Sequence, residues 1–152
     1  MKKILAMLGC ALAVVLMTSL FGSSIQAGAA GEGQKTQQEI ILELQNAYRV
    51  QVGLKPLKLT TELQTAANIR ASEASTFFSH MRPDGSEWWT VDPERAWGEN
   101  LYSGQNSAER IVSAWMNSRY HYENVMDPDF RTCGIGLVYA NGRWYCVQEF
   151  GY

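Results

Sequence analysis

GIGLVYANGRWYCVQEF, residues 134–150, is the most informative stretch of the chain, because it predicts two paired strands joined by a turn of known geometry. Apolar residues alternate with other residues on both sides of Asn141-Gly142, a dipeptide that favours a two-residue type I′ hairpin turn. In that register Ala140 faces Arg143 across the turn. This part of the chain is therefore predicted to be an antiparallel β-hairpin.

The same register bears on the two cysteines of the hairpin, Cys133 and Cys146. Leu137 would face Cys146 and Phe150 would face Cys133, so the two thiols share a face but lie four residues apart along the strands. At about 3.4 Å per residue this separation is about 13 Å, beyond the reach of a disulfide. A β-bulge at a neighbouring glycine would shorten it. The sequence leaves two alternatives open, a Cys133–Cys146 disulfide or two free thiols.

Helical periodicity dominates the chain before the hairpin. Apolar residues recur at helical spacing over residues 36–53, and again over residues 60–78, where Thr60 is the predicted N-cap. A third helix is predicted over residues 106–116, with Asn106 at its start. Helices at the front and strands at the back predict an α+β domain.

The N-terminal residues predict export. Lys2 and Lys3 precede an apolar stretch over residues 4–17, and Ala27-Gly28-Ala29 has the pattern of a signal-peptidase site. An uncleaved membrane anchor is the alternative, for which the apolar stretch is short. We divide the chain into a signal peptide at 1–29, a short polar lead-in segment at 30–37 and a folded domain at 38–152.

Composition and charge exclude several classes of protein. The 152 residues are 46% apolar, which is too apolar for a disordered chain. Removing Lys2 and Lys3 from the 13 basic residues leaves 11 against 15 acidic ones, and no basic run follows, so we expect no nucleic-acid partner. After signal removal we expect no membrane span. The predicted location is secreted, either extracellular or associated with the cell wall.

Two histidines and a glutamate are the candidates for chemistry. His80 and His121 each follow a predicted helix, beside polar residues, and Glu99 lies in an apolar run, where an unpaired carboxylate is costly. We expect the three to converge on one cleft, where Glu99 would accept a hydrogen bond from one or both histidines and the contact would raise the pKa of a histidine that makes it. Such a set suits a divalent metal such as zinc, and it equally suits a hydrogen-bonded structural network.

Four motifs in a fixed order support this interpretation. They are FSHMRPDGS at 78–86, GENL at 98–101, WMNSRYHYENV at 115–125, and the hairpin at 134–150. Together the motifs resemble the bacterial branch of the CAP superfamily, which covers cysteine-rich secretory proteins, venom allergens and plant pathogenesis-related proteins. The resemblance extends over residues 40–150.

The resemblance implies a three-layer α-β-α sandwich with a central antiparallel sheet, and a cleft that binds divalent metal in some members. His80, Glu99 and His121 match three of the four cleft residues of the family, and we also expect Asn100, which follows Glu99 in the same motif, to line the cleft. The fourth, a glutamate three residues after the helix tryptophan, is replaced here by Ser118. Because this loss removes an anionic ligand, we expect any zinc to bind weakly.

Three functions remain open at the level of sequence. The first, which we favour, is a secreted module whose cleft binds a lipid, a peptide or a cell-wall component. The second is a metal-dependent hydrolase of the peptidase type, using His80, Glu99 and His121; a serine variant would need Ser79 or Ser118 beside a histidine. The third is a structural or stress-related exported protein with a vestigial cleft.

Overall fold

The computed structural model describes residues 35–152, so the predicted signal peptide and most of the predicted lead-in segment lie outside the described residues. The elements follow in the order α1 (Gln37–Gln51), β1 (Lys58–Leu59), α2 (Thr61–Thr76), the 3-10 turn η1 (Trp88–Val91), β2 (Gly98–Gly104), α3 (Ala108–Met116), α4 (Arg119–Val125), β3 (Thr132–Ala140) and β4 (Arg143–Gly151). Among the helices of residues 35–152, none is both long enough and apolar enough to cross a membrane.

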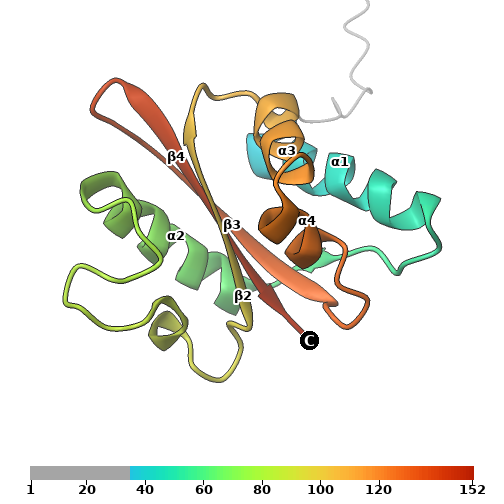
Figure 1. The fold of residues 1–152 in the computed structure, drawn as a ribbon, viewed down its shortest axis with the longest axis horizontal. Helices are drawn as coiled ribbons and strands as arrows, with labels where there is room; N and C mark the ends of the chain where they lie inside the picture. Colours follow the sequence, from blue (N-terminus) through green and yellow to red (C-terminus); the bar gives the residue numbers. More distant parts are fainter. Residues whose placement is uncertain (1–34) are drawn as a thin grey trace, which may run out of the picture. The chain divides into compact units, whose positions relative to one another are not determined.

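These elements form the three-layer α-β-α sandwich that the motifs imply. The sheet has the strand order β1-β3-β4-β2, with α2 on one face and α1, α3 and α4 on the other (Figure 1). The three long strands are antiparallel, as expected, whereas the two-residue β1 pairs with β3 in parallel and makes the sheet mixed. Strand β2 is an edge strand, so one of its two sides is not paired with another strand.

The hairpin has the predicted register, with Ala140 opposite Arg143. Asn141 and Gly142 both adopt positive φ angles, of 52° and 77°, as a type I′ turn requires. Cys133 and Cys146 face Phe150 and Leu137 respectively and are free, so of the two alternatives the structure has the thiols and not the disulfide.

Both thiols are fully buried on the face of the sheet that α1 and α3 cover. Burial raises the pKa of the Cys133 thiol to about 12 and that of the Cys146 thiol further. Both cysteines therefore stay protonated and act as small apolar core residues.

The helices differ from the predictions mainly at their ends. The N-cap of α3 is Ser107, whose hydroxyl accepts from the Arg110 backbone N–H, and not the predicted Asn106. Thr60 is the N-cap of α2, as predicted, although its side chain makes no capping hydrogen bond. Helix α4 was not predicted: His121 lies within this short helix rather than after the end of the preceding one.

Two glycines allow α2 to pack close to the sheet. A Cβ atom added to Gly134 would lie 2.0 Å from the carbonyl oxygen of Leu63, and one added to Gly136 would lie 2.1 Å from that of Ala67. Since backbone atoms of a helix cannot move aside cheaply, only glycine fits at these two positions of β3. The close approach sets the depth at which the side chains of α2 meet β2 and β4.

This packing predicts the effect of a methyl group at the helix–sheet interface. Gly134→Ala should lower the free energy of unfolding by about 3 kcal/mol, because α2 must move away from β3. Gly104→Ala on β2 is the matched control, since its added Cβ would meet only the end of the Tyr102 side chain, which can rotate. Urea denaturation of both variants measures the difference, and equal losses would contradict the role given to Gly134.

Candidate functional site

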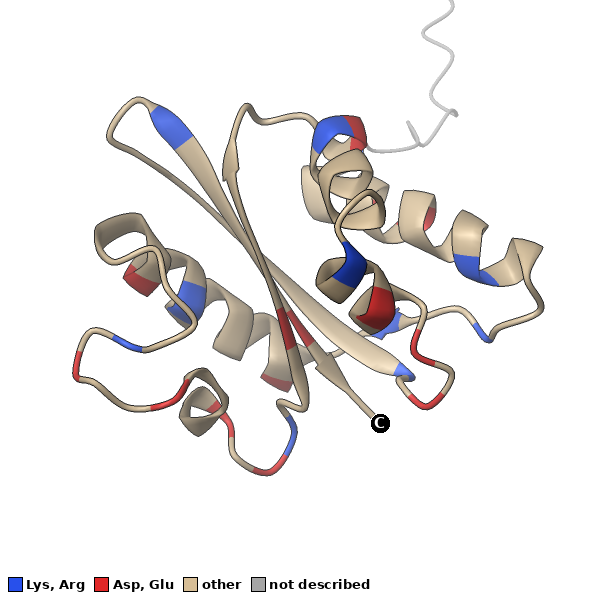
Figure 2. Ribbon diagram, in the orientation of Figure 1, with Lys and Arg blue, Asp and Glu red and all other residues tan. Residues whose placement is uncertain are grey.

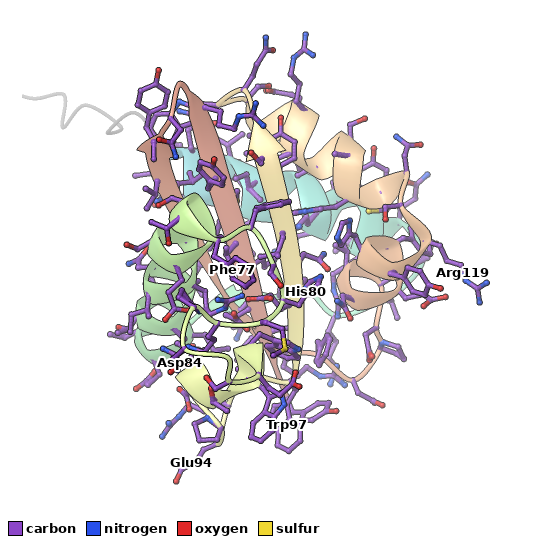
Figure 3. All side chains as sticks on the ribbon, turned by 60° about the vertical axis from the view of Figure 1, so that its left-hand side comes forward. Phe77, His80, Asp84, Glu94, Trp97 and Arg119 are labelled. Carbon is purple, nitrogen blue, oxygen red and sulfur yellow. The ribbon has the colours of Figure 1, made fainter. Side chains whose placement is uncertain are left out.

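A pocket of about 520 Å³ opens across the free edge of β2. Its lining residues come from both helical layers and from the edge strand; they are His80, Trp88, Trp97, Gly98, Glu99, Ser118, Tyr120, His121 and Asn124. His80 comes from the loop after α2 and His121 from α4, so the two histidines meet around the strand and not on one element. Figure 3 shows His80 beside β2 and Trp97 near the end of that strand.

On the α2 side of the pocket, Glu99 binds both Arg70 and His80. Its side chain is 1% exposed, and its Oε2 accepts from Nε of the fully buried Arg70 at 2.7 Å. Its Oε1 accepts from Arg70 Nη2 at 3.2 Å and lies 2.8 Å from Nδ1 of His80. Arg70 also donates to the Ser79 carbonyl, so the residue before His80 is fixed by the same guanidinium. Of the two histidines, His80 makes the expected contact with Glu99.

A second ion pair extends this cluster. Glu73 of α2 accepts from Arg70 Nη1 at 2.7 Å and from Arg82 Nη2 at 2.6 Å. Burial opposes ionisation of Glu73, but the hydrogen bonds from Arg82 and Arg70 outweigh it and lower the pKa of this carboxyl. The loop that carries His80 is thereby held to α2 on both sides of the histidine.

His121 is positioned from the opposite layer. Asn100 Nδ2 donates to the His121 carbonyl at 3.1 Å, and Asn124 Nδ2 donates to Asn100 Oδ1 at 2.9 Å and to the Glu99 carbonyl on the strand edge. Asn100 is fully buried and does not line the pocket, so it positions α4 rather than facing a ligand. Burial lowers the pKa of His121, and the charge of His80 lowers it further. His121 is therefore neutral at physiological pH.

The predicted set of three metal ligands is not assembled. Across residues 35–152, no three His, Cys, Asp or Glu side chains are grouped so that they could hold a metal ion. Both oxygens of Glu99 are occupied by Arg70 and His80, which makes this carboxylate a poor ligand. Its contact with Nδ1 instead leaves Nε2 of His80 free, an arrangement typical of carboxylate-oriented histidine ligands. Glu99 therefore has the place of a residue that orients His80, and not that of a metal ligand.

Glu149 is a buried carboxyl that the sequence analysis missed. It lies opposite Glu99 in the β2–β4 register, and the two acidic segments of these strands lie side by side in Figure 2. Neither of its oxygens has a hydrogen-bond partner among residues 35–152. The neighbouring charge of Arg70 is already matched by Glu99 and Glu73. Burial, with the charge of Glu99 adding to it, raises the pKa of Glu149 well above its usual range, so this carboxyl is protonated.

Sequence reasoning also missed Arg70, although a signal was present. Arg70 lies three residues after Ala67 and four before Ala74, both of which belong to the predicted apolar face of the second helix. A charge on such a face requires a buried counter-charge. Glu149 had a comparable signal, because strand alternation places it on the same face as Tyr145 and Val147.

Comparison with known proteins agrees with the fold and the motifs. The model of the cysteine-rich secretory protein family, CAP, matches residues 42–150, and the chain belongs to this family. It is 33% identical over 118 residues to the uncharacterized protein YkwD of Bacillus subtilis, covering 72% of this chain and 45% of YkwD. The chain thus spans less than half the length of that relative.

Two solved structures show the same fold at low sequence identity. One is an extracellular protein containing an SCP domain from Bacillus anthracis, with a TM-score of 0.66 and 20% identity over 76% of this chain and 40% of that one. The other is NaASP2 with Zn²⁺, with a TM-score of 0.60 and 16% identity over 82% of this chain and 84% of that one.

The Arg70–Glu99 pair predicts a large cost for removing one of its charges. Glu99→Gln should lower the free energy of unfolding by about 3 kcal/mol, because a buried guanidinium loses a counter-charge. Glu123→Gln is the control; it breaks the exposed Arg119–Glu123 pair, which should cost under about 1 kcal/mol. Urea denaturation at pH 7 compares them, and similar small losses would show that Arg70 does not depend on Glu99.

Glu149 predicts a pH-dependent gain in stability. In the unfolded chain Glu149 loses its proton near pH 4.3, whereas in the folded protein it keeps the proton to higher pH. Above pH 4.3 this residue therefore lowers the free energy of unfolding, and the loss grows as pH rises. Glu149→Gln, neutral at every pH, should raise the free energy of unfolding more at pH 7 than at pH 4. Denaturation at both pH values tests this, with the exposed Glu94→Gln as control. An equal effect at both values would mean that the pKa of Glu149 is the same in the two states.

Proposed function

We propose that the protein is a secreted ligand-binding module of the CAP family, and that the pocket around His80 and His121 is its binding site. The observation that carries the proposal is the form of this pocket. It is about 520 Å³ in volume, large enough for a small ligand, and it combines imidazole, hydroxyl and amide groups with aromatic faces. The classes of ligand that we consider are a lipid, a peptide and a cell-wall component.

Binding is favoured over hydrolysis by the contacts of the candidate catalytic groups. A catalytic zinc site uses three protein ligands, and Glu99, the third of the predicted set, is bound by Arg70 and His80. The Ser79 hydroxyl accepts from the Met81 backbone N–H, which is a structural contact. We therefore propose no hydrolytic step.

Secretion is part of the proposal. Its support is the charged and apolar N-terminal pattern of the sequence, together with the extracellular relative from Bacillus anthracis. Edman sequencing of protein recovered from the culture medium would identify the mature N-terminus. A cleaved chain beginning near residue 30 is the expected result. Full-length protein retained with the cells would contradict it.

Ligand binding is tested by filling the pocket. Ser118→Phe should displace a small molecule that co-purifies with the wild-type protein, because residue 118 lines the pocket. Ser113→Phe, on the exposed face of α3, is the matched control. Native mass spectrometry compares the three proteins, and a ligand retained equally by Ser118→Phe would place binding outside this pocket.

Weak zinc binding through the two imidazoles is a further part of the proposal. NaASP2, solved with Zn²⁺, has the same fold. His80 and His121 would be the protein ligands, and a bound divalent ion would supply a Lewis acid at the pocket. Ser118→Glu would add a carboxylate near them and should raise zinc affinity about tenfold, with Ser113→Glu as control.

Isothermal titration calorimetry with zinc alone measures this effect. His121→Ala should abolish binding, and circular dichroism confirms that each variant is folded. Zinc binding that survives His121→Ala, or that is unchanged by Ser118→Glu, would show that the ion is held elsewhere.

A further inference from the structure

A second pocket, which we call the tryptophan pocket, adjoins the histidine pocket. It has a volume of about 370 Å³ and is lined by Trp88, Trp89, Pro93, Ala96 and Trp97. Trp88 and Trp97 also line the histidine pocket, so the two cavities share a wall. Trp89 and Trp97 are about half exposed, at 45% and 53%, although tryptophan is among the side chains that gain most from burial. Three indole rings are thus left accessible around one cavity.

The chain around this pocket is acidic. Glu87 precedes Trp88, Asp92 precedes Pro93, and Glu94 follows it; acidic segments accordingly surround η1 in Figure 2. Arg95 is the basic residue of this stretch; its Nη1 lies 3.3 Å from Asp92 and 3.5 Å from Glu94, so one positive charge offsets part of the three negative ones. Figure 3 shows Glu94 and Trp97 at the same end of the molecule. The stretch from Glu87 to Arg95 therefore has three acidic residues and one basic residue, an excess of negative charge beside the pocket.

Aromatic faces in a negative field select cations. The face of an indole ring carries the negative part of its quadrupole, and tryptophan is the strongest of the aromatic residues in cation–π binding. An anion would be repelled by the acidic residues, and a small metal ion would lose its water without gaining oxygen ligands from this lining. An organic cation of low charge density is not repelled by the acidic residues, and it loses little hydration energy on entering the pocket.

The lining also distinguishes between kinds of organic ligand. Tryptophan, proline and alanine side chains offer no hydrogen-bond acceptor. A primary ammonium group has three N–H donors, which these side chains cannot pair. A quaternary ammonium group has no N–H donor and presents methyl groups to the rings.

We propose that the tryptophan pocket binds the quaternary ammonium group of a small choline-type solute. The three indole rings contact the methyl groups, and the carboxylates of Glu87 and Glu94 supply the long-range attraction. This inference goes beyond the proposed function, because it requires neither zinc nor the imidazoles of His80 and His121.

The test compares choline with 3,3-dimethylbutan-1-ol, its uncharged isostere, on the purified protein. Intrinsic tryptophan fluorescence and calorimetry follow each titration. Choline should bind about tenfold more tightly than the isostere, since only the cation gains from the ring quadrupoles. Its affinity should fall severalfold between about 0.02 M and 0.5 M sodium chloride, because salt screens the exposed carboxylates.

Two pairs of variants separate the aromatic and the acidic contributions. Trp89→Leu keeps an apolar side chain but removes a ring, and it should weaken choline binding about tenfold while leaving isostere binding nearly unchanged. Trp144→Leu, at the distant end of the β2–β4 ladder and outside the pocket, is its control. Glu87→Gln should weaken choline binding a few-fold at low salt, and Glu109→Gln on α3 should not.

Several results would overturn the proposal. These are equal affinities for choline and its isostere, equal effects of Trp89→Leu and Trp144→Leu, and no choline binding up to about 0.1 M. Binding to phosphatidylcholine vesicles without binding of free choline would also overturn it, and would indicate a membrane-surface site instead. The zinc and pocket-filling experiments test the histidine pocket. A negative result with choline would therefore not decide whether the histidine pocket binds its own ligand.

Discussion

The buried pair of Arg70 and Glu99 is the interaction on which the candidate site depends. One guanidinium joins α2 to the edge strand β2 and to the Ser79 carbonyl of the loop that carries His80. A buried charge without its partner is very costly, so the elements that hold these groups are strongly coupled. The orientation of His80 follows from this pair, because the same carboxylate contacts its Nδ1.

The side of the pocket formed by α4 is positioned by neutral hydrogen bonds from α3 and α4 to the open edge of β2. Asn124 of α4 donates to the Glu99 carbonyl, and Trp115 of α3 donates to the Leu101 carbonyl. Such contacts occupy backbone acceptors that an edge strand would otherwise expose. Consecutive residues of β2 point to opposite faces, so Glu99 binds the α2 layer and Asn100 binds α4. The pocket straddles the strand for this reason.

Much of the fold could be predicted from local patterns. Asn141-Gly142 determined the turn and the register of the hairpin, because its positive φ angles are rare in other residue pairs. Helix α4 was beyond this reasoning, since seven residues are too few to show a clear period. The parallel strand β1 was also missed, because its two residues are a strand only through pairing with β3.

The hairpin, the main helices, the family motifs and the chemical distinctiveness of His80, Glu99 and His121 could all be read from the sequence. The contacts of these three residues could not, because they depend on how the helices and the sheet pack together. Glu99 binds Arg70, which lies 29 residues earlier, and it faces Glu149, whose raised pKa arises from burial and from that neighbour. Local sequence patterns report on backbone conformation and on which face is apolar, whereas the charge state of a buried group depends on every element packed around it.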